Sequence, residues 1–172
     1  MPERNTASQL ILRPMTIADL SSVEELDRVS FSTPWPKDAF AYELMRNRNS
    51  VCWVAEWLKD INQSVLIGSI VIWLEIQKAH IGTLAIKPGF RKRGFGQRLL
   101  AAALLVCIQR GVKNVTLEVR AGNLAAQALY HKFGFEASGL KEAYYQDTHE
   151  DALIMVLDPL NEDRLDELLN RG

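Results

Sequence analysis

A basic segment with two glycines, residues 86–98, has the residue types and spacing best suited to bind an anion. It reads Ile-Lys-Pro-Gly-Phe-Arg-Lys-Arg-Gly-Phe-Gly-Gln-Arg and separates a β-type run from a long apolar run with helical spacing. Backbone N–H groups at a helix start are unpaired and lie at the positive end of the helix dipole, so they attract phosphate oxygens. Gly94 and Gly96 lack a Cβ atom and would let a pyrophosphate approach the backbone.

Two better-known phosphate motifs are excluded by the spacing of this segment. A Walker loop ends in Gly-Lys-Ser/Thr, which is absent here, and the dinucleotide fingerprint needs a third glycine where this chain has Leu99. The remaining alternative is a tight turn with a solvated basic surface. Because the two glycines, the basic run 91–93 and a preceding strand occur together, the segment favours phosphate binding.

The overall charge favours one anionic ligand over a polyanion. The 172 residues carry a formal net charge of −1, whereas nucleic-acid binding usually needs a clear basic excess. Positive charge is concentrated locally, at Lys87, at 91–93 and at Arg98. We therefore expect a small anionic ligand and no nucleic-acid partner.

The cysteines and apolar runs predict a cytoplasmic protein without a membrane partner. Cys52 and Cys107 both lie in apolar runs, where cysteine usually packs as a small hydrophobe in a reducing compartment. The N-terminal residues include no long apolar stretch of the signal-peptide type. The apolar run 99–108 is too short to span a bilayer, which takes about 20 residues.

Sequence periodicity predicts the elements that must position the basic segment. Alternating, β-branched and aromatic stretches predict strands at residues 10–13, 51–57, 65–76, 79–87, 115–120 and 152–158. Helical spacing and capping signals predict helices at residues 16–28, 36–47, 96–109, 123–133 and 160–169. We also expect a turn at 60–64, a bulge at Gly68, and helix ends at Gly111 and Gly134.

The order of these elements predicts an α/β (α+β) fold in three layers. Residues 79–133 form a βαβα unit, which implies parallel strands joined by a right-handed crossover. The strands before this unit read as hairpins, so the sheet should be mixed and mostly antiparallel. No repeat or linker divides the chain, and we expect one domain, 1–172, with a core at 10–158 and an appended helix at 160–170.

Glu118 is a candidate functional side chain on a predicted strand. Residues 115, 117 and 119 are apolar and take one face, while Glu118 takes the other. A glutamate there is more often merely solvated. However, glutamate is uncommon in strands, and this strand neighbours the one before the basic segment, where open α/β sheets bind ligands.

The strand, the motif Arg91-x-x-Gly94-x-Gly96 and the apolar helix together resemble the coenzyme A signature of the GNAT superfamily of N-acetyltransferases. The resemblance continues downstream, where Leu-Glu-Val-Arg, Asn, Ala-Leu-Tyr and Phe-Gly-Phe-Glu recur in the family's order at residues 117–120, 123, 128–130 and 133–136. Within the superfamily, the chain is similar to bacterial ribosomal-protein alanine N-acetyltransferases (RimI type). Supporting stretches are Phe-Ser-Thr-Pro-Trp at 31–35, Tyr-Tyr at 144–145 and Asp-Ala-Leu-Ile-Met at 151–155.

The resemblance implies a three-layer GNAT fold, an acetyl-CoA site and two catalytic residues. The family pattern makes Glu118 the general base for the acceptor amine and Tyr130 the general acid for the departing CoA thiolate. It places the pantetheine arm along residues 84–86, at the end of the strand before the basic segment, and the pyrophosphate on the basic segment itself. The implied cofactor-binding residues are Leu84, Ala85, Ile86, Arg91, Lys92, Arg93, Gly94, Phe95, Gly96, Gln97 and Asn123.

Helix periodicity agrees with a joint role for Asn123 and Tyr130. They lie seven residues apart, so both fall on one stripe of the predicted helix, and we expect Leu129 and Phe133 to face the core instead. A lone helical tyrosine otherwise usually packs with its hydroxyl group in water.

The remaining aromatic and histidine side chains leave two interpretations open. Trp35, Tyr144 and Tyr145 are either core aromatics or a peptide-binding rim. The three histidines, at 80, 131 and 149, show no metal-ligand spacing, so we expect no metal.

We therefore expect an acetyl-CoA-dependent N-acetyltransferase that modifies the N-terminal amine of a protein, in particular an alanine-starting ribosomal protein of the small subunit. One alternative is acetylation of a small amine, such as a polyamine or an antibiotic. Another is a regulatory module that binds acyl-CoA without turnover, which an intact Glu118 and Tyr130 disfavour. A cysteine nucleophile is disfavoured because Cys107 lies in the middle of a predicted helix and Cys52 lies in an early strand.

Overall fold

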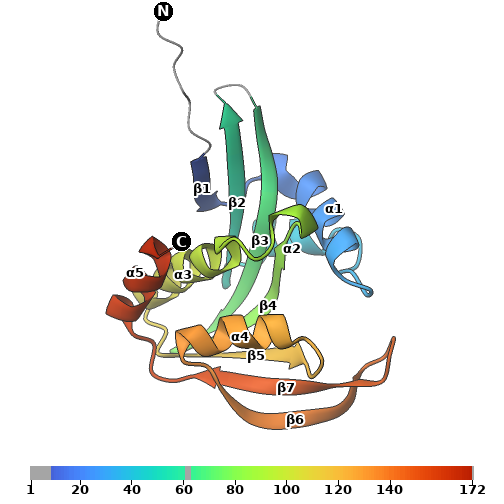
Figure 1. Cartoon of the computed structure of the whole chain (residues 1–172), viewed down its shortest axis with the longest axis vertical. Helices are drawn as coiled ribbons and strands as arrows, with labels where there is room; N and C mark the ends of the chain where they lie inside the picture. Colours follow the sequence, from blue (N-terminus) through green and yellow to red (C-terminus); the bar gives the residue numbers. More distant parts are fainter. Residues whose placement is uncertain (1–8, 61–62, 172) are drawn as a thin grey trace, which may run out of the picture.

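A seven-stranded sheet forms the centre of the protein in a computed structural model, which describes residues 9–60 and 63–171 (Figure 1). The strand order is β1-β2-β3-β4-β5-β7-β6, and every neighbouring pair is antiparallel except β4 and β5. The strands are β1 (Gln9–Pro14), β2 (Ser50–Asp60), β3 (Gln63–Glu75), β4 (Lys78–Ile86), β5 (Asn114–Arg120), β6 (Glu136–Tyr145) and β7 (Glu150–Leu157).

Helices cover both faces of this sheet and complete the three predicted layers (Figure 1). The elements α1 (Leu20–Ser30) and α2 (Ala39–Met45) pack on one face. The elements α3 (Phe95–Gln109), α4 (Leu124–Phe133) and α5 (Glu162–Asn170) pack on the other. Each face of the sheet has its own hydrophobic core, and successive residues of one strand pack into opposite cores. In β2, Val54 packs beneath α1 and Ala55 beneath α3, both without solvent exposure.

The long helix α3 is apolar almost all round because it is enclosed between the sheet and α5. Leu99, Leu100, Leu104 and Cys107 have no exposed surface. Leu165 and Leu168 of α5 join the same core, and the Leu160 N–H donates to the Lys113 carbonyl. The C-terminal helix, which we expected to be an appendage, thus packs directly against the element that follows the basic segment.

Most of the predicted elements are confirmed, with informative exceptions. The expected helix at 36–47 begins only at Ala39, because Asp38 has a positive φ of 64° and interrupts the helical backbone. The bulge expected at Gly68 lies beside it: Ala55 pairs with Gly68 and Glu56 with Leu66, so one extra residue bulges from β3. Part of the expected 60–64 turn, residues 61–62, lies outside the described residues.

The strand β6 was missed because eight of its ten residues are exposed. A solvated strand at the end of a sheet carries no apolar alternation, so periodicity gives no signal for it. Its partner β7 is half-buried and was predicted.

The two parallel strands separate part of the way along their length. Pairing of β4 with β5 runs from Lys78–Asn114 to Ile81–Leu117 and stops there, although β4 continues to Ile86 and β5 to Arg120. Residues 83–86 of β4 remain paired with β3 on their other side, and Gly82 lies at a bulge. The separation leaves a wedge with unpaired backbone groups on β4, and such groups need a partner.

Candidate active site

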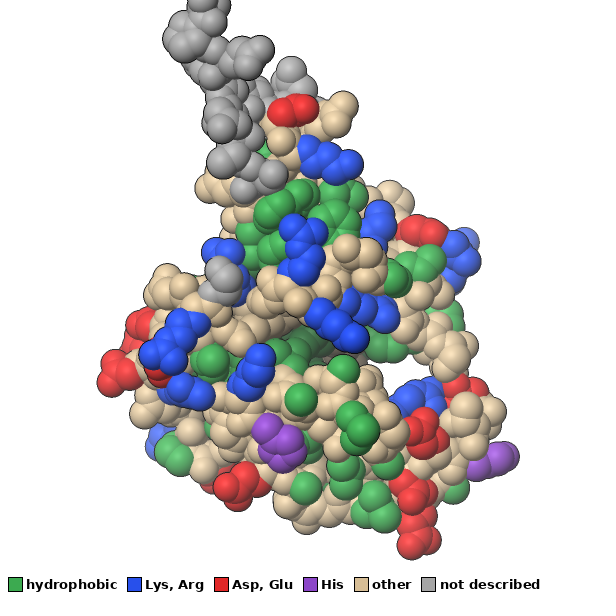
Figure 2. Space-filling view, in the orientation of Figure 1, with side chains coloured by type: hydrophobic (Ala, Val, Ile, Leu, Met, Phe, Trp, Pro, Cys, Tyr) green, Lys and Arg blue, Asp and Glu red, His purple; other side chains and the backbone are tan. Residues whose placement is uncertain are grey.

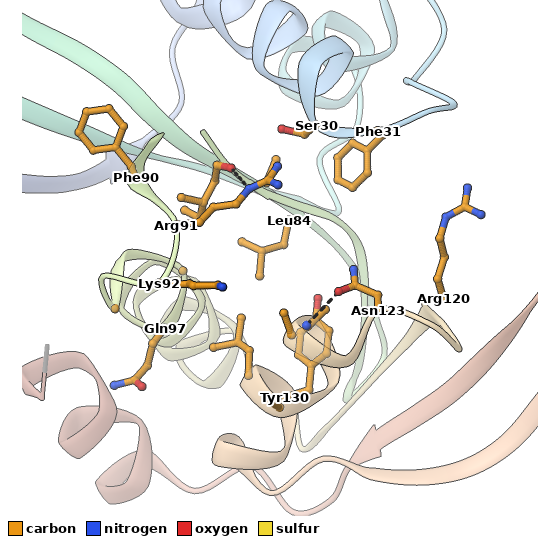
Figure 3. A pocket seen from close by; sticks show the side chains of 18 of the residues that line it. Ser30, Phe31, Leu84, Phe90, Arg91, Lys92, Gln97, Arg120, Asn123 and Tyr130 are labelled. Carbon is orange, nitrogen blue, oxygen red and sulfur yellow. Dashed lines mark hydrogen bonds between the residues drawn. The ribbon is translucent and has the colours of Figure 1, made fainter. Parts of the chain in front are cut away.

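A cavity of about 690 Å3 opens from the wedge between β4 and β5 (Figure 3). One wall is β4, one is the start of α3 with the loop before it, and one is α4. Its volume lies within the range usual for small-molecule sites. Of the predicted residues, those that line it are Leu84, Ala85, Ile86, Arg91, Lys92, Gly94, Gly96, Gln97, Asn123 and Tyr130.

The backbone of the basic segment turns sharply into α3. Lys92 has a φ of 60° and Gly94 a φ of 78°, immediately before the helix starts at Phe95. The Arg91 Nε atom donates to the Ile86 carbonyl at 2.8 Å, which fixes the loop to the end of β4. The first N–H groups of α3 therefore face an opening rimmed by positive charge, and Figure 2 shows Lys and Arg side chains gathered along the hollow on this face.

Three of the predicted cofactor residues direct their side chains elsewhere. The Arg93 guanidinium lies 5.0–5.5 Å from the ring centroids of Trp57, Phe90 and Phe95, and Phe95 itself is buried. Neither Arg93 nor Phe95 lines the cavity. The Gln97 side chain points away from it (Figure 3) and donates to two carbonyls at the end of α5, those of Leu168 and Arg171. Of these three residues, only Gln97 lines the cavity.

The helix α4 supplies the opposite wall through Asn123 and Tyr130 (Figure 3). The Asn123 Oδ1 atom accepts a hydrogen bond from the Ala126 N–H and caps the helix, as its position predicted. Burial raises the pKa of Tyr130, so its hydroxyl keeps its proton at neutral pH. Leu129, which we expected to face the core, lines the cavity beside Tyr130 and also packs against the core.

Glu118 stands at the point where the two strands separate. It is the first residue of β5 beyond the last pair with β4, and its side chain is 17% exposed. Its Oε2 atom lies 2.7 Å from His80 Nε2, and its Oε1 atom accepts from Lys141 Nζ at 2.6 Å. As predicted, Glu118 faces away from the buried Leu117 and Val119.

His80 is a site residue that sequence reasoning missed. It pairs with Thr116 across the parallel strands, and its Nδ1 atom lies 2.8 Å from Thr116 Oγ1. Both ring nitrogens are thus engaged, which orients the ring against Glu118. The register of β4 on β5 brings these side chains together, and that register is not visible from either strand alone.

Trp35 forms part of an aromatic stack that ends at His80. Its ring stacks on Phe40 at 4.7 Å and on Trp73 at 5.8 Å, and Trp73 stacks on His80 at 5.8 Å. The Trp35 backbone N–H donates to the buried carboxylate of Asp27, whose pKa is raised by burial. Trp35 therefore packs behind Trp73, which separates it from His80, and belongs to the partly buried core.

Arg120 links Tyr145 to an ionic cluster at the other end of the cavity. Its guanidinium lies 3.8 Å from the Tyr145 ring centroid and pairs with Asp147 at 2.9 Å and Glu150 at 3.2 Å. The Ser32 hydroxyl donates to Asp147 at 2.5 Å, and with Arg120 it holds the Asp147 pKa at about 2. This ionic clasp (Ser32, Asp147, Arg120 and Glu150) joins the segment after α1 to the β6–β7 hairpin.

The two tyrosines at the end of β6, Tyr144 and Tyr145, lie close to this clasp. Tyr144 and Tyr145 meet edge to face at 5.2 Å, and Tyr144 also lies 4.9 Å from Lys141 Nζ. Burial raises the pKa of Tyr145. Neither tyrosine lines the cavity, and both lie on the hairpin formed by β6 and β7.

Two other chemistries find no support in the described part of the chain. Burial raises the pKa of Cys107 to about 12, and burial also raises the pKa of Cys52, so neither thiol is activated. Within residues 9–60 and 63–171, no three His, Cys, Asp or Glu side chains are grouped to hold a metal ion. In the same ranges, no helix has the length and apolar character needed to cross a membrane.

Comparison with known proteins agrees with this geometry. Residues 20–135 match the Acetyltransferase (GNAT) family. A putative ribosomal protein bS18-alanine N-acetyltransferase of Bacillus subtilis is 38% identical over 144 residues, which cover 84% of this chain and 92% of that protein. The crystal structure of the ribosomal-protein-S18-alanine N-acetyltransferase from Escherichia coli superposes with a TM-score of 0.75 at 25% identity, covering 89% of this chain and 96% of that one.

A second solved structure shares the fold at lower identity. Arabidopsis thaliana NAA60, solved in complex with acetyl-CoA, has a TM-score of 0.78 at 21% identity and covers 87% of this chain and 98% of its own. The family match spans the basic segment, the strand separation and α4, which are the features that build the cavity. The chain belongs to the acetyltransferase (GNAT) family and is an N-acetyltransferase.

Proposed function

We propose that this enzyme transfers the acetyl group of acetyl-CoA to the N-terminal α-amine of a protein, namely an alanine-starting small-subunit ribosomal protein in the cytoplasm. The single observation that carries the proposal is the wedge between β4 and β5, which has the basic loop at its open end and Glu118 at the point where the strands separate, beside the cavity. The likeness to bS18-alanine N-acetyltransferases of two bacteria supports the choice of acceptor.

The cavity fits coenzyme A in shape and in the groups it offers. An extended pantetheine arm can lie along the unpaired backbone of residues 82–86 in the manner of an added strand. The positive φ of Gly94 and the absence of a side chain at Gly96 suit a pyrophosphate on the first turn of α3. Acetyl-CoA bound in this way supplies a thioester that an amine can attack.

Glu118 is placed to remove a proton from the acceptor amine, directly or through a water molecule. His80 Nε2 lies 2.7 Å from one carboxylate oxygen, and the Trp73 ring stacks on His80 and restrains the imidazole ring in turn. The acceptor ammonium then competes with Lys141 for the other oxygen. An α-amine suits this base, because its pKa is about 7.7–8.0 against about 10.4 for lysine.

Tyr130 is placed to return a proton to the departing thiolate. It lines the cavity on the side opposite Leu84, and burial keeps its hydroxyl protonated. A free thiol has a pKa of about 8.5, so protonation of the thiolate is a modest requirement. We therefore assign Tyr130 a smaller share of the rate than Glu118.

The acceptor end of the cavity has the parts of a peptide site. Phe31 and Arg120 lie at that end (Figure 3), and the ionic clasp spans it from α1 to the hairpin. Tyr144, with 46% of its surface exposed, offers an amphipathic ring beyond it. These groups suit an extended backbone better than a small polyamine.

Mass spectrometry on three acceptors tests the proposal. The enzyme and acetyl-CoA are incubated with a peptide that begins with alanine, with an N-terminally blocked copy carrying internal lysines, and with spermidine. We expect a single acetyl group on the α-amine of the first peptide and little on the others. Equal acetylation of the blocked peptide, or a preference for spermidine, would overturn the N-terminal assignment.

A further inference from the structure

The general base already has an amine of the enzyme as its partner. Lys141 Nζ donates to Glu118 Oε1 at 2.6 Å, from a side chain that is 42% exposed. Lys141 belongs to β6 and reaches Glu118 of β5 across the intervening strand β7. Within the described residues, no other lysine contacts Glu118.

The position of Lys141 matches what the reaction requires of an acceptor. A general base must lie about 2.6–3.2 Å from the atom whose proton it removes, and Lys141 Nζ meets that condition without a substrate present. The flexible four-carbon stem of lysine leaves the amine free to move toward the wedge, next to which Glu118 stands. The contact with the Tyr144 ring holds the same amine on the acceptor side.

We propose that Lys141 is an internal acceptor, which the enzyme acetylates when no peptide is bound. The inference rests on the proposed acetyl transfer through Glu118. The Lys141 ammonium gives one proton to the Glu118 carboxylate, and the neutral Nζ attacks the thioester carbonyl carbon. The carbon–sulfur bond breaks, the thiolate takes a proton from Tyr130, and the second nitrogen proton restores the Tyr130 hydroxyl. The products are acetyl-lysine, CoA and one proton released through Glu118.

The reaction should be slow beside acetylation of a peptide. The charged and titratable groups that face Lys141 are Glu118 of β5, its partner His80 of β4, and Tyr144 of β6. The hydrogen bond to Glu118 raises the Lys141 pKa, so the neutral amine is scarce at pH 7. A peptide α-amine, with its lower pKa, therefore displaces Lys141 and reacts first.

The Glu118→Gln variant separates enzyme catalysis from chemical acetylation. Loss of the carboxylate removes the group that raises the Lys141 pKa, so uncatalysed acetylation should become faster. If Glu118 is the base, acetylation of Lys141 should instead become about a hundredfold slower. The two explanations thus predict changes of opposite sign.

The experiment incubates the whole protein with acetyl-CoA alone and follows each lysine by peptide mapping. We expect Lys141 to be acetylated at least about tenfold faster than Lys78 or Lys113. The half-time should not depend on enzyme concentration, because the reaction is intramolecular. The Lys141→Arg variant should show no acetylation at residue 141. Parallel reactions contain the alanine peptide. If the peptide is acetylated but Lys141 reacts no faster than other lysines, or reacts faster in Glu118→Gln, the inference fails and the proposed function stands. If neither is acetylated, the proposed function fails as well.

Discussion

The two ends of the cavity present different kinds of chemical group. The cofactor end relies on backbone groups: the unpaired stretch of β4, the positive φ of Gly94 and the first turn of α3. The acceptor end relies on polar and charged side chains from four strands and the segment after α1, among them Glu118, Lys141 and the ionic clasp. Figure 2 shows the same contrast, with acidic side chains gathered over the β6–β7 hairpin and basic ones along the hollow.

Because of this difference, cofactor binding and acceptor specificity depend on different parts of the cavity. Backbone groups can hold a ligand common to a whole family whatever side chains surround them. Side chains at the acceptor end can be exchanged without disturbing the loop, so specificity can change there. Substitutions at the two ends should therefore have separable effects on cofactor affinity and on acceptor turnover.

The largest effect is expected at the acceptor end, from Glu118→Gln. Loss of the base should reduce turnover of the alanine peptide at pH 7 by about a hundredfold or more, with acetyl-CoA affinity unchanged. Activity should partly recover as the pH rises, because solvent then supplies the neutral amine. A steady-state pH profile measures this, with Glu56→Gln, another ion-paired glutamate on a strand, as the control. A variant as fast as wild type at pH 7 would exclude Glu118 as the base.

At the cofactor end, Gly94→Val should weaken acetyl-CoA binding by about tenfold or more, since strain and obstruction each cost about 1–2 kcal/mol. The left-handed backbone there disfavours any side chain, and a β-branched one also fills the space for phosphate. Gly111→Val is the matched control, because Gly111 has a φ of 83° and open space around it, away from the cavity. Calorimetry on both folded variants decides: equal affinities would place the pyrophosphate elsewhere.

Tyr130→Phe should have a smaller effect on turnover, about tenfold or less, because the thiolate is a good leaving group without help. The ring remains packed against Phe135 at 5.5 Å, so the fold and the cofactor affinity should persist. Tyr42→Phe, at an exposed position, serves as the control. A large loss of acetyl-CoA affinity in Tyr130→Phe would show that the hydroxyl binds the cofactor instead.

The smallest effect is expected from loosening the ionic clasp. Ser32→Ala removes one donor to Asp147 and leaves Arg120 in place, so it should change the KM for peptide by only about twofold to fivefold. The KM for acetyl-CoA should not change. Titration of both substrates separates these constants, and a change confined to acetyl-CoA would contradict the division between the two ends.

The two ends of the cavity also differ in how far they could be predicted from the sequence. The elements of the cofactor end follow from local signals: apolar periodicity for α3, an Asn123 cap for α4 and two glycines before a helix. The fold class followed from the order of these elements. The direction of the Arg93 and Gln97 side chains did not, because aromatic rings at 57 and 90 and carbonyls at 168 and 171 attract them from distant parts of the chain.

The acceptor end was less predictable because its contacts depend on strand register. His80, Lys141 and Arg120 acquire their roles only when β4, β5 and β6 are aligned, and β6 itself gave no periodic signal. Glu118 was identified through its family pattern, whereas the groups that hold it were not. The site roles of Tyr144 and Tyr145 stay predictions.

The separation of β4 from β5 also bears on aggregation. An unpaired strand normally offers its N–H and C=O groups to a strand of another molecule, and proteins block such edges with charge, proline or a covering helix. Here the open edge of β4 lies inside a cavity walled by α3 and α4. A thin, extended molecule can reach it, but a polypeptide strand with side chains on both faces would collide with those helices. The enzyme can thus keep an open strand edge for its ligand without exposing a template for intermolecular β-sheet.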